Sequence, residues 1–343
     1  MVNIFHNVTL ADFSTMRLGG PAAHLAEIHD HNELTEAVGW AIGQGLPTIM
    51  IGSGSNIVWK DEGFPGLVLV NKIRRFETFD EDESNTYVTI GAGEIWDNVV
   101  ERTVQAGLTG IEALSLIPGT AGGTPVQNVG AYGQELSQTL VSVEAYDMQT
   151  KQFVNIPAID CGFGYRTSRF KTTDHGRFFI TAITLHLTKG NPQPPFYPSV
   201  QTYFEEHNTK DVTPGVLRAA VIAIRSAKLP DPAIVANNGS FFANPVVDDS
   251  SLGLFLESYP NIPHWPTEDG QVKLSAAWLI EQCGFKDFHD PETGMATWPK
   301  QPLVFVNESA KSTADLLKFR QKILDAVQAK FNIALTQEPE LLP

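Results

Sequence analysis

Ser240 stands between Asn237-Asn238-Gly239 and two phenylalanines in the stretch NNGSFFANP. A serine that only forms a turn needs no aromatic neighbours, whereas apolar neighbours keep bulk water away from a hydroxyl that handles a proton. The GxSxG motif of serine hydrolases is absent, because a phenylalanine follows the serine directly. From these residues alone, proton chemistry at Ser240 is a hypothesis.

Three other stretches carry charges that could serve a negatively charged ligand. In CGFGYRTSRFK, Tyr165 precedes Arg166, and an arginine can stabilise charge on a carboxylate or enolate, although an exposed basic strand end has the same composition. In RSAKLPDP, Arg225 and Lys228 could hold a diphosphate or only complement a helix dipole. The two carboxylates of QEPE, in the tail, could equally be solvated.

Three glycine-rich stretches suit close approach of a ligand to the backbone. GSGSN fits a phosphate-binding turn and a tight structural turn equally well, and it matches neither GxGxxG nor a Walker loop. IGAGEIW repeats a strand and a glycine turn, with Trp96 as a core residue in the simplest interpretation. IPGTAGGTPVQNVGAYG combines glycines, hydroxyls and amides without a charge. We interpret this long segment as a binding loop for a large, flat, polar ligand.

Hydrophobic periodicity predicts the elements that position these residues. Strands are predicted at AHLAEI, LPTIMI, GLVLVN, TYVTIG, VSVEAYDM, KQFVNI, FFITAITLHLT and PLVFVN. Helices are predicted at ELTEAVGWAIGQG, DNVVERTVQAG, TPGVLRAAVIAIRSAK, SAAWLIEQCGF and STADLLKFRQKILDAVQAKF. The proline-rich run NPQPPFYPS predicts a loop or a flap. The succession indicates an α+β protein with two neighbouring units, 1–71 and 72–215, and a more helical third, 216–330. We expect the tail 331–343 to pack on the second unit.

Composition limits the class of protein. The net charge of −15 over 343 residues argues against a general affinity for nucleic acid or anionic membrane. Cys161 and Cys283 are too few for a disulfide framework, and the nine histidines form no ligand motif, so no metal is expected. The amino terminus does not resemble a secretion signal, and no run approaches about 18 apolar residues. We therefore expect a cytoplasmic protein.

Taken in order, the motifs resemble the UDP-N-acetylenolpyruvoylglucosamine reductase family. They are GSGSN, GAGEIW, IPGTAGGTPVQNVGAYGQE, FGYRTSRF, NNGSFFANP and KLSAAWLIEQCGF, and the resemblance extends from STMRLGGPA at 14–22 to EPE at 338–340. The segment around Tyr197 resembles the form of the family that closes a tyrosine loop over substrate. The implied fold is a two-subdomain FAD-binding fold of the vanillyl-alcohol-oxidase type plus a third α+β substrate-binding domain.

The resemblance implies a monomeric enzyme that uses FAD and NADPH to reduce UDP-N-acetylglucosamine enolpyruvate to UDP-N-acetylmuramate for peptidoglycan synthesis. The first glycine loop has no histidine or cysteine that could anchor the flavin, so FAD is expected to be non-covalent. By similarity, the FAD diphosphate lies on Gly52, Ser53, Gly54, Ser55 and Asn56. The flavin is lined by Ile117, Pro118, Gly119, Gly123, Thr124, Gln127, Asn128, Gly130 and Ala131.

The resemblance also implies catalytic roles. Hydride delivery to the enolpyruvyl methylene leaves negative charge on the adjacent carbon and carboxylate, which Arg166 would neutralise. Glu340 matches the carboxylate partner of that arginine, with Glu338 as the alternative because the tail carries extra residues before EPE. Ser240 matches the family's proton donor, and Tyr165 would help to define the site.

The residues implied to bind substrate are Tyr197, Arg225, Lys228, Asn244 and Gln282. Trp298 departs from a histidine common in the family, and we expect this to alter the surface more than the chemistry. Two alternatives are another FAD-dependent oxidoreductase of the same fold and a catalytically inactive nucleotide-sugar binding protein. Ser240 and the Arg225/Lys228 pair argue against the first alternative, and the complete catalytic set argues against the second.

Overall fold

The computed structural model describes residues 2–267 and 270–343 and divides the chain into two compact units. Unit 1 comprises Met1–Val8, Ala22–Gly54 and Phe64–Ala227, and unit 2 comprises Thr9–Pro21, Ser55–Gly63 and Lys228–Pro343. The three predicted domains divide the chain differently and stay a prediction. Helix α4 (Pro214–Lys228), which that prediction assigned to the third domain, belongs to unit 1 as far as Ala227.

The first sheet of unit 1 has the strand order β1-β2-β5-β3. β2 and β3 both pair with β5 in parallel, so the chain needs a crossover, and helix α1 supplies one. The apolar side of α1 packs Leu34 and Val38 into the same core as Leu67 and Leu69 of β5. The bounds are β1 (Phe5–Thr9), β2 (Pro21–Ile28), α1 (His31–Gly43), β3 (Thr48–Ile51) and β5 (Phe64–Asn71).

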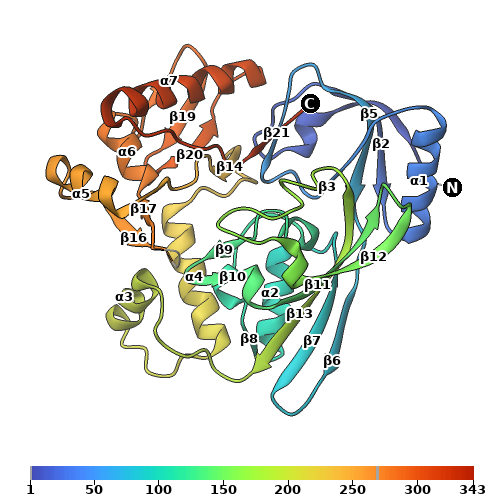
Figure 1. The fold of residues 1–343 in the computed structure, drawn as a ribbon, viewed down its shortest axis with the longest axis horizontal. Coiled ribbons are helices and arrows are strands. Elements are labelled where there is room, and N and C mark those ends of the chain that lie inside the picture. Colours follow the sequence, from blue (N-terminus) through green and yellow to red (C-terminus); the bar gives the residue numbers. More distant parts are fainter. Residues whose placement is uncertain (1, 268–269) are drawn as a thin grey trace. The chain divides into compact units, whose positions relative to one another are not determined.

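The second sheet of unit 1 has the order β12-β11-β13-β7-β6, with β8 also paired to β13. Its pairings are antiparallel, and the strands β13, β7 and β6 run side by side in Figure 1. Helix α2 buries Trp96, Val99 and Val100 in the core of this sheet. The bounds are β6 (Phe76–Asp80), β7 (Asn85–Gly91), α2 (Trp96–Gln105), β8 (Leu108–Thr109), β11 (Leu140–Asp147), β12 (Gln152–Pro157) and β13 (Phe178–Lys189).

Shorter elements of unit 1 carry its loops. They are the 3₁₀ helices η2 (Glu112–Leu114), η3 (Ala121–Gly123), η4 (Leu136–Gln138) and η5 (Ala158–Cys161), the strands β9 (Gly130–Ala131) and β10 (Gln134–Glu135), and helix α3 (Pro198–Glu206). Helices α3 and α4 share a small core in which Phe204 packs with Leu217 and Val221.

Unit 2 contains a four-stranded sheet of order β14-β20-β19-β18 and a three-stranded sheet of order β15-β17-β16. Its core holds Phe241, Phe242, Phe305 and Phe319, all essentially inaccessible to solvent. The bounds are η1 (Leu10–Phe13), β4 (Ile57–Trp59), β14 (Asn237–Ser240), β15 (Val246–Val247), α5 (Asp249–Ser258), β16 (His264–Pro266), β17 (Val272–Leu274), α6 (Ala276–Gln282), β18 (His289–Asp290), β19 (Met295–Trp298), β20 (Gln301–Asn307), α7 (Thr313–Phe331) and β21 (Glu340–Leu342).

The tail pairs with a segment from early in the sequence. Strand β21 runs parallel to β4, with Glu340 opposite Ile57 and Leu342 opposite Trp59. Trp59 and Leu342 are both buried, so this pairing covers apolar side chains of both strands. The sequence analysis expected the tail on residues 72–215, whereas the strand pairing found here is with residues 57–59.

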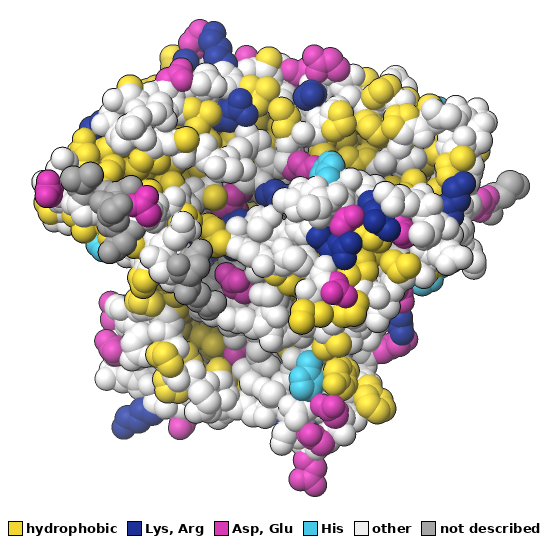
Figure 2. All heavy atoms as spheres, viewed as in Figure 1, with side chains coloured by type: hydrophobic (Ala, Val, Ile, Leu, Met, Phe, Trp, Pro, Cys, Tyr) yellow, Lys and Arg dark blue, Asp and Glu magenta, His cyan; other side chains and the backbone are white. Residues whose placement is uncertain are grey.

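The predicted α+β class and all of the predicted strands and helices are confirmed. Helices α3 and α5 were not predicted. Helix α3 begins at Pro198, within the proline-rich run that was predicted as a loop or a flap, because proline suits the first helical turn. Within the described residues, no helix has both the length and the hydropathy needed to cross a membrane. Figure 2 shows acidic side chains spread over one face, in keeping with the net charge of −15.

Candidate active site

The two predicted ligand loops of unit 1 touch one another. Strand β3 ends at Ile51 and the turn Gly52–Gly54 follows. A Cβ on Gly52 would lie 2.3 Å from Oγ1 of Thr120, so only glycine allows this contact with the long loop. Gly54 has a φ of +72°, in the left-handed region that glycine adopts without strain. The remaining residues of the motif, Ser55 and Asn56, belong to unit 2.

Backbone hydrogen bonds join the IGAGEIW turn to the long loop. The N–H of Gly122 donates to Ala92 O at 2.8 Å, and the N–H of Ala121 donates to Glu94 O at 2.9 Å. The N–H of Trp96 donates to Gly119 O at 3.1 Å, and its side chain is fully buried, which confirms Trp96 as a core residue. This turn therefore positions residues 119–122 by backbone hydrogen bonds.

Two predicted FAD residues use their side chains to hold the loop itself. The hydroxyl of Thr124 donates to Ala121 O at 2.7 Å. The buried Asn128 amide donates to Glu135 Oε2 at 2.9 Å, and its oxygen accepts from Ser137 N at 3.0 Å. The remaining predicted residues of the loop are partly or fully exposed: Ile117, Pro118, Gly119, Gly123, Gln127, Gly130 and Ala131.

The residues of unit 1 fit FAD. Glycine allows the turn after β3 to press against the long loop, and a Cβ on Gly123 would meet no atom within 4 Å, which leaves that stretch of backbone open to a ligand. Amide and hydroxyl groups without a charge suit the polar edge of a flavin. No histidine or cysteine lies in the turn after β3, so this turn offers neither side chain for a covalent bond to the flavin.

Arg166 reaches the end of the long loop. Its Nη2 donates to Gly130 O at 2.8 Å, and its guanidinium carbon lies 5.3 Å from the ring centre of Tyr165. A Cβ on Gly130 would lie 2.8 Å from Cγ of Glu135 and 3.2 Å from Nη1 of Arg166, so a side chain here would displace Glu135 and crowd Arg166. Arg166 itself has a φ of +56°. The structure thus brings Tyr165 and Arg166 to the loop predicted to line the flavin.

Tyr197 lies against Tyr132, which the sequence analysis did not name. The two rings meet edge to face, with centres 5.6 Å apart. Burial raises the pKa of Tyr132, and burial lowers the pKa of the neighbouring Arg225 against the opposing effect of Tyr132 and Asp97. Among the described residues, Nε of Arg225 is buried without a hydrogen-bond partner. Tyr132 could have been found from its place in GAYG, at the end of the glycine-rich loop.

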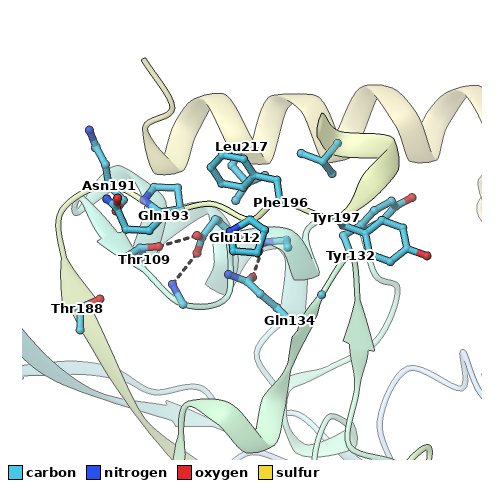
Figure 3. Close-up of a pocket in the computed structure, with 16 residues that line it drawn as sticks. Thr109, Glu112, Tyr132, Gln134, Thr188, Asn191, Gln193, Phe196, Tyr197 and Leu217 are labelled. Atoms are coloured by element: carbon cyan, nitrogen blue, oxygen red, sulfur yellow. Dashed lines mark hydrogen bonds between the residues drawn. The ribbon is translucent and has the colours of Figure 1, made fainter. Parts of the chain in front are cut away.

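A cavity of 370 Å³ lies beside these tyrosines, within unit 1. In Figure 3, Tyr132 and Tyr197 lie at one end of it, and Asn191 and Gln193 lie at the other. Glu112 lies between them and accepts from Thr109 Oγ1 at 2.5 Å and from Gly110 N at 2.6 Å. Residues of the proline-rich run, Tyr197 among them, therefore line a cavity with both polar and apolar walls.

In unit 2, the residues around Ser240 are held as the sequence suggested. Gly239 has a φ of +70°, and its N–H donates to Asn237 Oδ1 at 2.8 Å, which forms the turn. Phe241 stacks on Phe305 with ring centres 4.5 Å apart, and Phe242 meets Phe305 edge to face at 5.5 Å. The aromatic residues thus anchor the strand that carries Ser240.

The same region brings together three predicted parts of the site. The Asn238 amide donates to Ser55 O at 3.3 Å, which connects the strand of Ser240 to the end of the first glycine motif. The N–H of Glu338 donates to Phe241 O, and the N–H of Glu340 donates to Asn56 O, both at 3.0 Å. The backbone of Glu340 is therefore held at the predicted site residue Asn56, and that of Glu338 at Phe241, which follows Ser240. The choice of Glu340 over Glu338 stays a prediction.

The other predicted substrate residues of unit 2 are spread along helix ends. Asn244 accepts from Ala276 N at 3.0 Å at the start of α6, whereas Gln282 is exposed at the opposite end of that helix. Lys228 is the exposed last residue of α4, and its carbonyl accepts from Trp298 Nε1 at 3.1 Å. Trp298, the departure from the family, thus contacts the backbone of a predicted substrate residue.

Comparison with known proteins identifies the family. Residues 22–153 match the model of an FAD binding domain, and residues 231–342 match the C-terminal domain of UDP-N-acetylenolpyruvoylglucosamine reductase. The reductase of that name from Cupriavidus pinatubonensis is 40% identical over 321 residues, which cover 94% of each chain. The chain belongs to the UDP-N-acetylenolpyruvoylglucosamine reductase family.

Other members of the UDP-N-acetylenolpyruvoylglucosamine reductase family match this chain over nearly its whole length, and a solved structure shares its fold. The Escherichia coli K12 reductase is 36% identical over 337 residues, which cover 98% of this chain and 95% of the relative. The crystal structure of the Thermus caldophilus reductase covers 100% of both chains with a TM-score of 0.69 at 24% identity. The predicted FAD-binding fold with a further C-terminal domain, and FAD as its cofactor, are confirmed.

Proposed function

We propose that this chain reduces UDP-N-acetylglucosamine enolpyruvate to UDP-N-acetylmuramate with NADPH, in the synthesis of peptidoglycan precursors. The observation that carries this function is the family match over 94% of the chain, which includes both the FAD-binding and the C-terminal domain. Bound FAD supplies the hydride relay from NADPH to the substrate. The flavin-side residues are those of the turn Gly52–Asn56 and the loop Ile117–Ala131.

Ser240 is the proposed proton donor to the substrate carbon next to the carboxylate. A hydroxyl is a weak acid, so it must be tightly placed to be effective. The turn at Gly239 and the stacking of Phe241 on Phe305 support such placement. Glu340 in the tail, with Glu338 as the alternative, is the proposed carboxylate partner of Arg166.

Arg166 is the proposed group that neutralises the negative charge that develops on the substrate. Its guanidinium is held by Gly130 O, and its neighbour Tyr165 packs close to it. A cation that is already in place when charge develops stabilises a transition state without further rearrangement. Arg225, Lys228 and Asn244 are proposed to hold the diphosphate or line its approach. Tyr197 is proposed to cap the bound substrate, and Gln282 is proposed to lie near it. The protein is further proposed to be a cytoplasmic monomer.

An anaerobic two-step mixing experiment tests the function. Purified protein is reduced with NADPH, and UDP-N-acetylglucosamine enolpyruvate is then added while the flavin absorbance is followed. Return of the oxidised flavin spectrum without oxygen is the expected result. If NADPH bleaches the flavin and the substrate does not restore it, the fold stands and the proposed substrate is wrong.

A further inference from the structure

Asp97, in the first turn of helix α2, accepts three hydrogen bonds. Arg218 of helix α4 donates Nη1 to Oδ1 at 2.6 Å and Nη2 to Oδ2 at 3.0 Å. The backbone N–H of Leu116 donates to Oδ1 at 2.6 Å. Arg218 is buried, so solvent competes little for this bidentate pair. One carboxylate therefore joins two helices and a loop of unit 1.

The residue whose N–H Asp97 accepts stands at the start of the proposed flavin loop. Leu116 directly precedes Ile117 and has a φ of +58°, a conformation that is unfavourable for leucine. The preceding residue of α2, Trp96, donates its indole N–H to Leu114 O at 3.1 Å and its backbone N–H to Gly119 O at 3.1 Å. The first turn of α2 therefore holds the start of the loop at residues 114, 116 and 119.

The partner of Asp97 lies on the helix that carries a proposed phosphate ligand. Arg218 and Arg225 are seven residues apart in α4 and so share one face of the helix. Burial disfavours the charged form of Asp97, but hydrogen bonds from Arg218 and Leu116, and the nearby Arg225, hold its pKa below the usual range. The carboxylate is thus an anion that faces both arginines and the loop.

We propose that Asp97 and Arg218 are positioning residues, which hold the start of the flavin loop and couple it to the helix that carries Arg225. This inference rests on the proposed function, in which Ile117–Ala131 lines the flavin. A loop that is held in its binding conformation before the ligand arrives loses less conformational freedom on binding. Loss of Asp97 should therefore weaken FAD binding although Asp97 does not touch the cofactor.

The test compares FAD release from Asp97→Ala, Asp97→Asn and Arg218→Met holoprotein. The dissociation constant is obtained from the recovery of flavin fluorescence on dilution. We expect a rise of about tenfold or more for Asp97→Ala, because a strained backbone amide loses a charged acceptor. Asp97→Asn should be milder, because its Oδ1 can still accept from Leu116. Arg218→Met keeps that acceptor as well and should also be milder than Asp97→Ala.

Unit 1 offers a matched control in Asp147 and Arg177. Asp147 also accepts two hydrogen bonds from an arginine, at 3.0 and 2.8 Å, and one from a backbone N–H, that of Gln149, at 2.9 Å. Asp147→Ala and Arg177→Met should lower the thermal stability of the protein and leave the FAD dissociation constant within about twofold of the wild type.

Each outcome decides the inference. If Asp97→Ala and Asp147→Ala change FAD release equally, or if Asp97→Ala leaves it unchanged, the pair is only structural and the inference is wrong. If Asp97→Ala does not fold, Asp97→Asn and Arg218→Met decide: each should raise the FAD dissociation constant beyond the range of about twofold allowed for the control pair, and a change within that range makes the inference wrong. Wild-type protein that fails the two-step mixing experiment would contradict the proposed function instead, since FAD release is measured without substrate.

Discussion

The backbone N–H of Glu338 donates to the carbonyl of Phe241 at 3.0 Å, and Phe241 is the residue after Ser240. Residue Phe242 continues the contact by pairing with Gln337. The tail therefore extends the sheet edge at the point where the proposed proton donor leaves strand β14. Glu338 makes this contact and Glu340 follows it two residues later, so changes in the tail are expected to reach Ser240 through the backbone.

Ser240→Ala should separate the two halves of the reaction. Reduction of the flavin by NADPH should keep its rate, because no proton donor is needed in that step. Reoxidation by UDP-N-acetylglucosamine enolpyruvate should slow by about 100- to 10,000-fold, the usual size of a general acid's contribution. Anaerobic stopped-flow absorbance measures both steps.

Ser275→Ala is the matched control for that variant in the same unit. Ser275 caps helix α6 by accepting from Trp278 N, so its loss should lower the free energy of unfolding by about 1 kcal/mol. Both half-reactions should keep their rates. Equal slowing of both half-reactions in Ser240→Ala would make Ser240 a structural residue.

Gly52→Ala should weaken FAD binding, and a second substitution should restore it. The new Cβ would lie 2.3 Å from Thr120 Oγ1 but 3.5 Å from Thr120 Cβ, so truncation of the threonine to alanine makes room. Gly52→Ala alone is expected to raise the FAD dissociation constant by about tenfold or more. The double variant Gly52→Ala/Thr120→Ala is expected to recover most of the lost affinity for FAD. A double variant no better than Gly52→Ala would show that another contact at Gly52 decides.

Asp147 should make unfolding sensitive to acid. Hydrogen bonds from Arg177 lower the pKa of Asp147 from its ordinary 3.8 to about 2 in the folded protein. The stabilisation is complete above pH 3.8 and is lost as the pH falls toward 2, because protonation then favours the unfolded chain. Asp147→Asn should cost about 2 kcal/mol at pH 7 and flatten the pH dependence of urea unfolding between those values. An unchanged slope in this pH window would contradict the assignment.

The two cysteines should differ in reactivity. Cys161 has no exposed surface, and burial raises the pKa of its thiol to about 11, so at pH 8 only about one thousandth is thiolate. Cys283 is half-buried and should react with iodoacetamide first. Peptide mass spectrometry measures both rates, and in denaturant the two rates should converge. Cys161 labelling as fast as Cys283 in the native protein would contradict the buried placement.

Local features of the fold were predictable because they depend on neighbouring residues. Period-two and period-3.6 patterns suffice to find β2, α1, β13 and α7, and the aromatic anchor of Ser240 follows from two adjacent phenylalanines. The uncharged, glycine-rich composition likewise marks the loop at 117–133 as a binding loop.

Contacts between distant segments were not predictable from these patterns. Asp97 and Arg218 each look like ordinary surface residues of amphipathic helices, and nothing in either helix indicates the other. Tyr132 was passed over because its neighbours suggested backbone contacts, whereas its ring meets Tyr197. The pairing of β4 with the tail was not predictable either, because β4 has only three residues and its partner strand lies far along the chain.

Unit 2 is assembled from three separated stretches, so during synthesis it cannot fold until the last of them has been made. Thr9–Pro21 and Ser55–Gly63 leave the ribosome well before Lys228, by on the order of ten seconds at about 5–20 residues per second. During that interval the side chains of Val58 and Trp59, fully covered in the finished protein, lack strand β21 and helix α7. The nascent chain therefore carries an exposed apolar segment that a chaperone can recognise, and unit 1 can complete its sheets first.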